Sequence, residues 1–173
     1  MGFVGRLARE KQVAKLIAAF QLLPDDAALI IVGDGPLRGE LETQCRRWAK
    51  PRAVHFTGAI SEPTRLNRYY NAFDLLVLPS THEGFGVAIL EALAAGTQVL
   101  ASDLPGPRAL LAEGRYGALS TARTPRDLAR EMLAALADPI SRARLAERAR
   151  EYSWKAVCER HAAILDARPS LEP

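Results

Sequence analysis

Two short runs, the apolar 28–32 (ALIIV) and 74–78 (DLLVL), which is apolar after Asp74, constrain the fold more than any other feature of the sequence. Consecutive apolar residues are typical of a strand buried on both faces, as in a parallel sheet that lies between two layers of helices. Shorter strand patterns occur at 3–5, 54–56 and 98–101. The sequence therefore predicts several buried parallel strands.

Helical patterns separate these strands. Residues 12–23 repeat apolar side chains at helical spacing, and Pro36 suits the first turn of a second helix that runs to about residue 49. Further helices are expected at 61–71, 85–95, 108–112, 125–137, 141–152 and 153–166. Strands that alternate with helices of this length form βαβ units. The predicted fold class is α/β, with a Rossmann-like parallel sheet flanked by helices.

Length and composition favour one domain over residues 1–173. A domain of this size buries enough surface to fold without a disulfide or a metal, and Cys45 and Cys158 are expected to be reduced thiols. The sequence lacks a signal-peptide pattern and a run of about 20 apolar residues, which favours a cytoplasmic protein. The net charge of +3 and the pI near 9.1 permit an anionic ligand or peripheral membrane contact; no nucleic-acid partner is expected.

Glycine and polar residues follow four of the predicted strands. The loops lie at 5–7, 33–35, 57–60 and 79–86. In a doubly wound sheet, ligands bind at the carboxyl ends of the strands, where these loops meet. The pattern indicates an anionic small molecule, in particular a nucleotide.

The loop 79–86 is the strongest candidate because it leaves a buried strand and enters a helix. The first turn of that helix offers free backbone N–H groups and the positive end of its dipole, which together bind phosphate. Gly84 and Gly86 would let a ligand approach the backbone. Glu83 would repel phosphate and therefore suits hydroxyl groups; the alternative is that it only complements the helix N-terminus.

Taken in order, the motifs resemble the C-terminal domain of retaining glycosyltransferase family 4, whose GT-B architecture sets two Rossmann-like domains across a cleft. The matching residues are 4–7 (VGRL), 10–11 (EK), 31–36 (IVGDGP), 56–58 (FTG), 69–70 (YY), 78–80 (LPS), 83–86 (EGFG), Glu91 and 101–103 (ASD). The resemblance covers essentially the whole chain. It implies one half of a GT-B enzyme whose N-terminal acceptor-binding domain is absent from this sequence.

The resemblance also implies a role for each matching residue. Arg6 and Lys11 would neutralise the donor diphosphate as it leaves, and Glu83 would lie near the transferred sugar, so these three form the expected catalytic set. Glu91 would bind ribose hydroxyls. The implied donor-binding set is Gly5, Arg6, Lys11, Ile60, Glu83, Gly84, Phe85, Gly86, Val87 and Glu91, with phosphate at the amides of Phe85, Gly86 and Val87 and the base near Ile60. No metal is expected.

At two positions the sequence departs from the family pattern. Gln12 stands where a glycine usually follows the Glu-Lys pair, and Ala109 stands where many members have a glutamate. The three histidines are assigned no role in the chemistry. His55 is expected to be structural, His82 to be a loop residue, and His161, three residues after Cys158, not to bind a metal.

The implied function is transfer of a sugar from a nucleotide-diphosphate donor, UDP- or GDP-linked, to an acceptor hydroxyl with retention at the anomeric carbon. Two alternatives are a nucleotide-binding module without transfer activity and a GT-B epimerase. The isolated domain is expected to be inactive. It is also expected to self-associate through apolar residues of the helix at 153–166.

Overall fold

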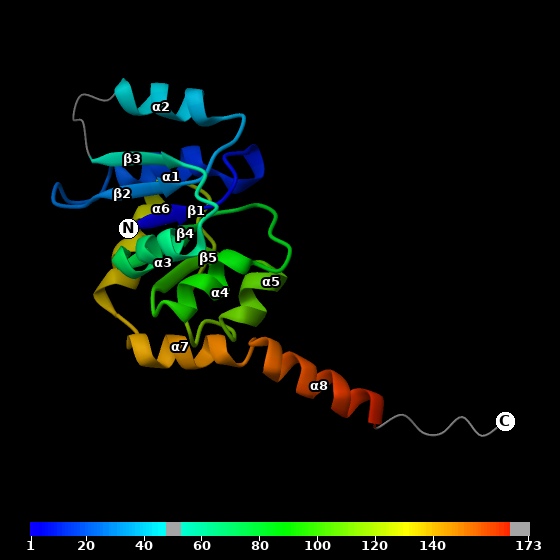
Figure 1. The fold of residues 1–173 in the computed structure, drawn as a ribbon. Helices are drawn as coiled ribbons and strands as arrows, with labels where there is room; N and C mark the ends of the chain where they lie inside the picture. Colours follow the sequence, from blue (N-terminus) through cyan, green and yellow to red (C-terminus); the bar gives the residue numbers. More distant parts are fainter. Residues whose placement is uncertain (48–52, 167–173) are drawn as a thin grey trace.

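The computed structural model describes residues 1–47 and 53–166. This part of the chain contains a six-stranded sheet in the order β3-β2-β1-β4-β5-β6, and every strand pair is parallel (Figure 1). The strands are Gly2–Val4 (β1), Leu29–Val32 (β2), Val54–Gly58 (β3), Leu75–Leu78 (β4), Gln98–Ser102 (β5) and Ala118–Ser120 (β6). The predicted Rossmann-like α/β class is confirmed.

The strand order creates a switch point between β1 and β4. From β1 the chain builds β2 and β3 on one side, and it then crosses to β4 on the other side of β1. Phe3 of β1 pairs with Ile31 of β2, and Gly2 pairs with Leu76 of β4. Ligands of doubly wound sheets bind at such a point, beyond the carboxyl ends of the strands.

Helices cover both faces of the sheet. They are Arg9–Lys11 (a 3-10 turn, η1), Val13–Phe20 (α1), Arg38–Arg46 (α2), Pro63–Ala72 (α3), Val87–Ala94 (α4), Pro105–Leu110 (α5), Pro125–Ala137 (α6), Arg142–Arg150 (α7) and Trp154–Asp166 (α8). On one face α1 packs against α6, and on the other α3 contacts α4, which also packs against α7. Figure 1 shows α8 projecting away from the body of the molecule.

The two apolar runs of the sequence form the interior strands β2 and β4. All four residues of β4 are buried, and in β2 only Ile30 is partly exposed. Phe3 of β1 and the inner face of α1, including Leu16 and Phe20, complete the core beside them. Burial on both faces explains why these strands lack the polar alternation of a surface sheet.

Local capping explains several helix boundaries. The side chain of Glu62 accepts hydrogen bonds from the backbone N–H groups of Thr64 and Arg65, and Pro63 occupies the first turn of α3. A carboxylate at this position satisfies donors that have no partner inside the helix. The helix expected at 61–71 is thereby confirmed, with bounds Pro63–Ala72.

The structure differs from the expected secondary structure at three places. Strand β6 was not predicted, because its three residues are too few to show a strand pattern; it lies at the edge of the sheet. The helix expected at 108–112 begins earlier, at Pro105, and ends at Leu110, since Ala112 and Glu113 have left-handed backbone angles. Pro36 lies in a turn before α2, which ends at Arg46; the expected end near residue 49 falls outside the described residues.

Within the described residues, no helix has both the length and the apolar character needed to cross a membrane.

Candidate functional site

The loops that follow β1 and β4 join at the switch point. Lys11 Nζ lies 2.7 Å from Glu83 Oε2, which makes an ion pair between residues 72 positions apart in the sequence. The backbone N–H of Thr81 donates to the carbonyl of Glu10 at 2.7 Å. Two of the three residues expected to be catalytic are therefore in direct contact.

The Lys11–Glu83 pair is partly shielded from water. The exposed fractions of the two side chains are 21% and 16%, and the hydroxyl of Ser80, itself buried, donates to the same Glu83 oxygen at 3.3 Å. Reduced hydration strengthens the interaction relative to a pair on an open surface. A lysine ammonium has three donors, so Lys11 can keep Glu83 and still bind a second anionic group.

Helix α4 begins beside this pair without a cap. Gly86, the residue before the helix, has φ 87° and ψ 49°, no described side chain accepts from its first turn, and that turn contains no acidic residue. Glu83 is bonded to Lys11 and Ser80 and accepts no described hydrogen bond from the first turn of this helix. The N-terminus of α4 keeps its free amides and the positive end of its dipole.

The two residues that flank Gly86 carry exposed apolar side chains. The exposed fraction is 55% for Phe85 and 60% for Val87. The Phe85 ring meets Tyr152 edge to face, with 6.1 Å between ring centroids. Arg148 in turn donates to the Tyr152 hydroxyl and to the carbonyls of Ala109 and Leu110. These hydrogen bonds hold Tyr152 in place, and Tyr152 in turn supports Phe85.

Helix α5 approaches the same loop closely at Gly106. A Cβ on Gly106 would lie 2.2 Å from the carbonyl oxygen of Gly84, whereas no described atom lies within 4 Å of a Cβ built on Gly84. Gly106 is therefore required by packing. Gly84 faces open space, where a ligand can approach its backbone.

Three further residues of the expected donor-binding set line one hollow. Gly5, Arg6 and Ile60 surround a space of about 280 Å³ with Asp34 and Leu66, beyond the ends of β1, β2 and β3. The Arg6 side chain is exposed and has no ion-pair partner among residues 1–47 and 53–166. A free guanidinium beside a partly apolar hollow suits a ligand with an anionic group and a planar ring.

Glu91 lies on α4 and is held by a residue to which the sequence assigned no role. The hydroxyl of Tyr70, in α3, donates to Glu91 Oε2 at 2.7 Å. Burial, followed by the Glu91 carboxylate, raises the pKa of Tyr70 far above its usual value. In the sequence, Tyr70 and Ser80 stand out only as parts of matching motifs, because the contacts of both depend on tertiary packing.

The two departures from the family pattern have different consequences. Gln12 adopts φ 53° and ψ 33°, the left-handed conformation that glycine accepts without strain, so a glycine at this position would fit the same backbone. Ala109 is exposed and offers no carboxylate. The nearby Arg108 instead makes two hydrogen bonds to Asp103, at 2.9 and 2.6 Å.

The histidines take no part in a metal site within the described residues, where no three His, Cys, Asp or Glu side chains gather to hold an ion. His82 and His55 are exposed. His161 contacts the carbonyl of Val157 in its own helix, and Cys158 is an exposed free thiol.

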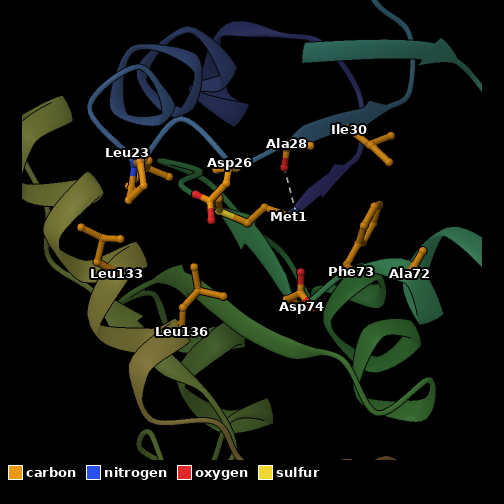
Figure 2. A pocket seen from close by; sticks show the side chains of 12 residues that line it. Met1, Leu23, Asp26, Ala28, Ile30, Ala72, Phe73, Asp74, Leu133 and Leu136 are labelled. Carbon is orange, nitrogen blue, oxygen red and sulfur yellow. Dashed lines mark hydrogen bonds between the residues drawn. The ribbon is translucent and has the colours of Figure 1, made fainter. Parts of the chain in front are cut away.

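A separate hollow of about 390 Å³ lies at the opposite end of the sheet, where the strands begin (Figure 2). Met1, Phe73 and Asp74 are among the residues that line it, and the Met1 amino group donates to the carbonyl of Ala28 at 3.0 Å. Leu133 and Leu136 of α6 form its other wall. None of the expected site residues borders this space.

The chain is similar to several known proteins. A GDP-mannose-dependent alpha-mannosyltransferase of Mycolicibacterium smegmatis is 44% identical over 119 residues, which are 69% of this chain and 29% of that protein. The D-inositol 3-phosphate glycosyltransferase of Corynebacterium urealyticum is 32% identical over 185 residues, covering 99% of this chain and 43% of the relative. Among solved structures, HepE of Anabaena in complex with UDP and glucose has a TM-score of 0.77 at 28% identity, with 96% of this chain and 48% of HepE covered.

The chain thus spans less than half the length of each of these proteins. The family model described as glycosyl transferases group 1 matches residues 1–152, which is most of the chain. This protein therefore belongs to the group 1 glycosyl transferases.

Proposed function

We propose that this chain is the donor-binding, C-terminal domain of a retaining glycosyltransferase of family 4, one half of a GT-B enzyme. It would bind a nucleotide-diphosphate sugar for transfer to an acceptor hydroxyl. The observation that carries the proposal is the Lys11–Glu83 pair, which joins a cation and a carboxylate at the switch point of the sheet. Such a pair offers one group for a diphosphate and one for sugar hydroxyls.

The diphosphate would lie between Arg6, Lys11 and the start of α4. Arg6 is free to bind phosphate, Lys11 keeps N–H donors in addition to the one that it donates to Glu83, and the first turn of α4 is uncapped. The relative HepE is described in complex with UDP, which supports a nucleotide ligand of the same class here. No metal is needed in this arrangement, because two cations and the helix dipole supply the positive charge.

The remaining site residues would each contact a different part of the donor. Glu83 would accept hydrogen bonds from the sugar, Glu91 from the ribose, and the base would lie near Ile60 in the hollow beyond β3. As the glycosidic bond breaks, negative charge grows on the diphosphate, and Arg6 and Lys11 stabilise it in a partly dehydrated site. The acceptor and its binding residues would come from the other half of the enzyme.

Titration calorimetry with UDP and with GDP tests the proposal. We expect saturable binding of at least one of them, and we expect it to weaken as salt is raised because charge dominates the contacts. No binding at millimolar nucleotide would refute the proposal. Tight binding without transfer, even when the other half of the enzyme is supplied, would instead favour a nucleotide-binding module.

A further inference from the structure

Tyr70 is held in place by contacts on every part of the residue. It is 2% exposed, its ring meets Phe73 edge to face with 6.3 Å between centroids, and its carbonyl accepts a hydrogen bond from the buried hydroxyl of Thr97. These contacts tie the last turn of α3 to the loop before β5. The Tyr70 hydroxyl therefore occupies a fixed position.

That hydroxyl is the donor in its contact with Glu91. Burial and the neighbouring carboxylate raise the pKa of Tyr70, so the phenol keeps its proton and donates to Glu91 Oε2 at 2.7 Å. Glu91 itself is exposed. A carboxylate has about four acceptor positions, of which Tyr70 occupies one, and the others remain open to hydroxyl groups from solution.

We propose that Tyr70 is a positioning residue that fixes Glu91 for the ribose hydroxyls and so sets the preference of the site for ribonucleotides over deoxyribonucleotides. The inference rests on the proposed function, in which Glu91 contacts the ribose. A glutamate side chain loses rotational freedom when it binds a ligand. Tyr70 removes part of that freedom beforehand, and a side chain already held in its bound conformation binds more tightly.

A purely structural role for the Tyr70–Glu91 contact predicts a different effect of removing the Tyr70 hydroxyl. A buried hydroxyl needs a hydrogen-bond partner, and Glu91 supplies one. If that were the whole function, loss of the hydroxyl would change stability but would affect ribonucleotides and deoxyribonucleotides alike. The ratio of the two affinities separates the two roles.

The test uses Tyr70→Phe, which keeps the ring and removes only the hydroxyl. Tyr69→Phe is the matched control, since Tyr69 is the adjacent tyrosine and is partly buried. The described hydrogen bond to the Glu91 side chain comes from Tyr70 and not from Tyr69. Calorimetry measures the dissociation constants of UDP or GDP, whichever the unaltered chain binds more tightly, and of its 2′-deoxy and 3′-deoxy forms.

We expect Tyr70→Phe to weaken ribonucleotide binding about three- to tenfold, the usual effect of one hydrogen bond, and to change deoxynucleotide binding less than about twofold. The preference for ribose should shrink accordingly, while Tyr69→Phe leaves it unchanged. In a Glu91→Ala background, Tyr70→Phe should cause no further loss, because the residue through which it acts is gone.

An undiminished preference for ribose in Tyr70→Phe, whether both ligands lose affinity equally or neither loses any, would overturn the inference alone. Both ligands are titrated into the same preparation, so a partly unfolded fraction cancels from the ratio and cannot produce this result. Failure of the unaltered chain to bind UDP or GDP would overturn the proposed function, and this inference with it.

Discussion

At the scale of single residues, Glu83 and Glu91 differ in what holds them. Glu83 pairs with the cation Lys11, whereas Glu91 accepts from the neutral Tyr70 and is otherwise open to solvent. Glu83 lies in the loop before α4, and Glu91 lies within the helix. Their environments therefore suit different parts of a nucleotide sugar.

We expect Glu91→Ala to weaken binding of UDP or GDP by about 1.5–3 kcal/mol, the value of a hydrogen bond to a charged group. Glu83→Ala should have a smaller effect or even tighten binding, because it leaves the Lys11 charge free for phosphate and because a nucleotide without a sugar does not reach Glu83. Calorimetry with nucleotide alone measures both. Equal losses for the two variants would contradict the assignment of ribose to Glu91.

Two glycines of the strand-end loops serve different purposes. A Cβ on Gly33 would lie 1.9 Å from the carbonyl oxygen of Gly5, and its φ of 141° disfavours other residues. We expect Gly33→Ala to lower the free energy of unfolding by at least about 2 kcal/mol. Gly84→Ala meets no described atom within 4 Å and should change the free energy of unfolding by less than about 0.5 kcal/mol.

Gly84→Ala should nevertheless reduce nucleotide affinity, because the added methyl group enters the space that the diphosphate would occupy. Urea denaturation of both variants, followed by calorimetry of Gly84→Ala, gives the comparison. A Gly84→Ala protein as unstable as Gly33→Ala would show that Gly84 is also a packing residue.

At the scale of elements, α8 is the least integrated part of the described fold. It projects from the body of the molecule (Figure 1), and its side chains Trp154 and Ile164 are 85% and 63% exposed. A tryptophan of this exposure offers roughly 150–250 Å² of surface for burial. Exposed apolar surface of this kind favours association.

We expect the isolated chain to self-associate through α8. Trp154→Ser should raise the dissociation constant of this self-association at least tenfold, since burial of such a side chain contributes roughly 2–3 kcal/mol. Lys155→Ser is the control, because Lys155 is equally exposed but charged. Sedimentation at several concentrations measures the effect. A monomeric chain at high concentration, or equal effects of the two substitutions, would exclude α8 as the contact surface.

At the scale of the whole molecule, the described residues supply one wall of the proposed cleft. Arg6, Lys11 and the start of α4 all lie at the carboxyl edge of one sheet, and in the proposed function the other half of the enzyme holds the acceptor. Correct positioning of two reactants can account for about 7–11 kcal/mol of barrier reduction. Water that reaches an open site also screens the cations.

We therefore expect the 173-residue chain to bind nucleotide but to transfer no sugar at a useful rate. An assay with labelled UDP- and GDP-sugars and a panel of acceptors checks this, with the chain's own nucleotide binding as the control for folding. Acceptor-dependent transfer by the monomeric chain would mean that the catalytic groups all lie within these residues.

The sequence alone determined the layered fold and the general location of the candidate site. Burial on both faces of a strand requires consecutive apolar residues, so the runs at 28–32 and 74–78 identified β2 and β4. Loop 79–86 was likewise recognisable, because glycine and a helix start are local features. The edge strand β6 escaped prediction, since three residues of mixed polarity are no different from a loop.

The tertiary structure alone decided which side chains meet. Lys11 and Glu83 are 72 residues apart, and only the crossing of the chain from β3 to β4 places their loops together. The contact between Tyr70 and Glu91 depends in the same way on how α3 packs against α4. Pairings between distant residues follow from strand order and helix packing, which depend on the whole core, whereas periodicity and turn residues are set by a few neighbours in the chain.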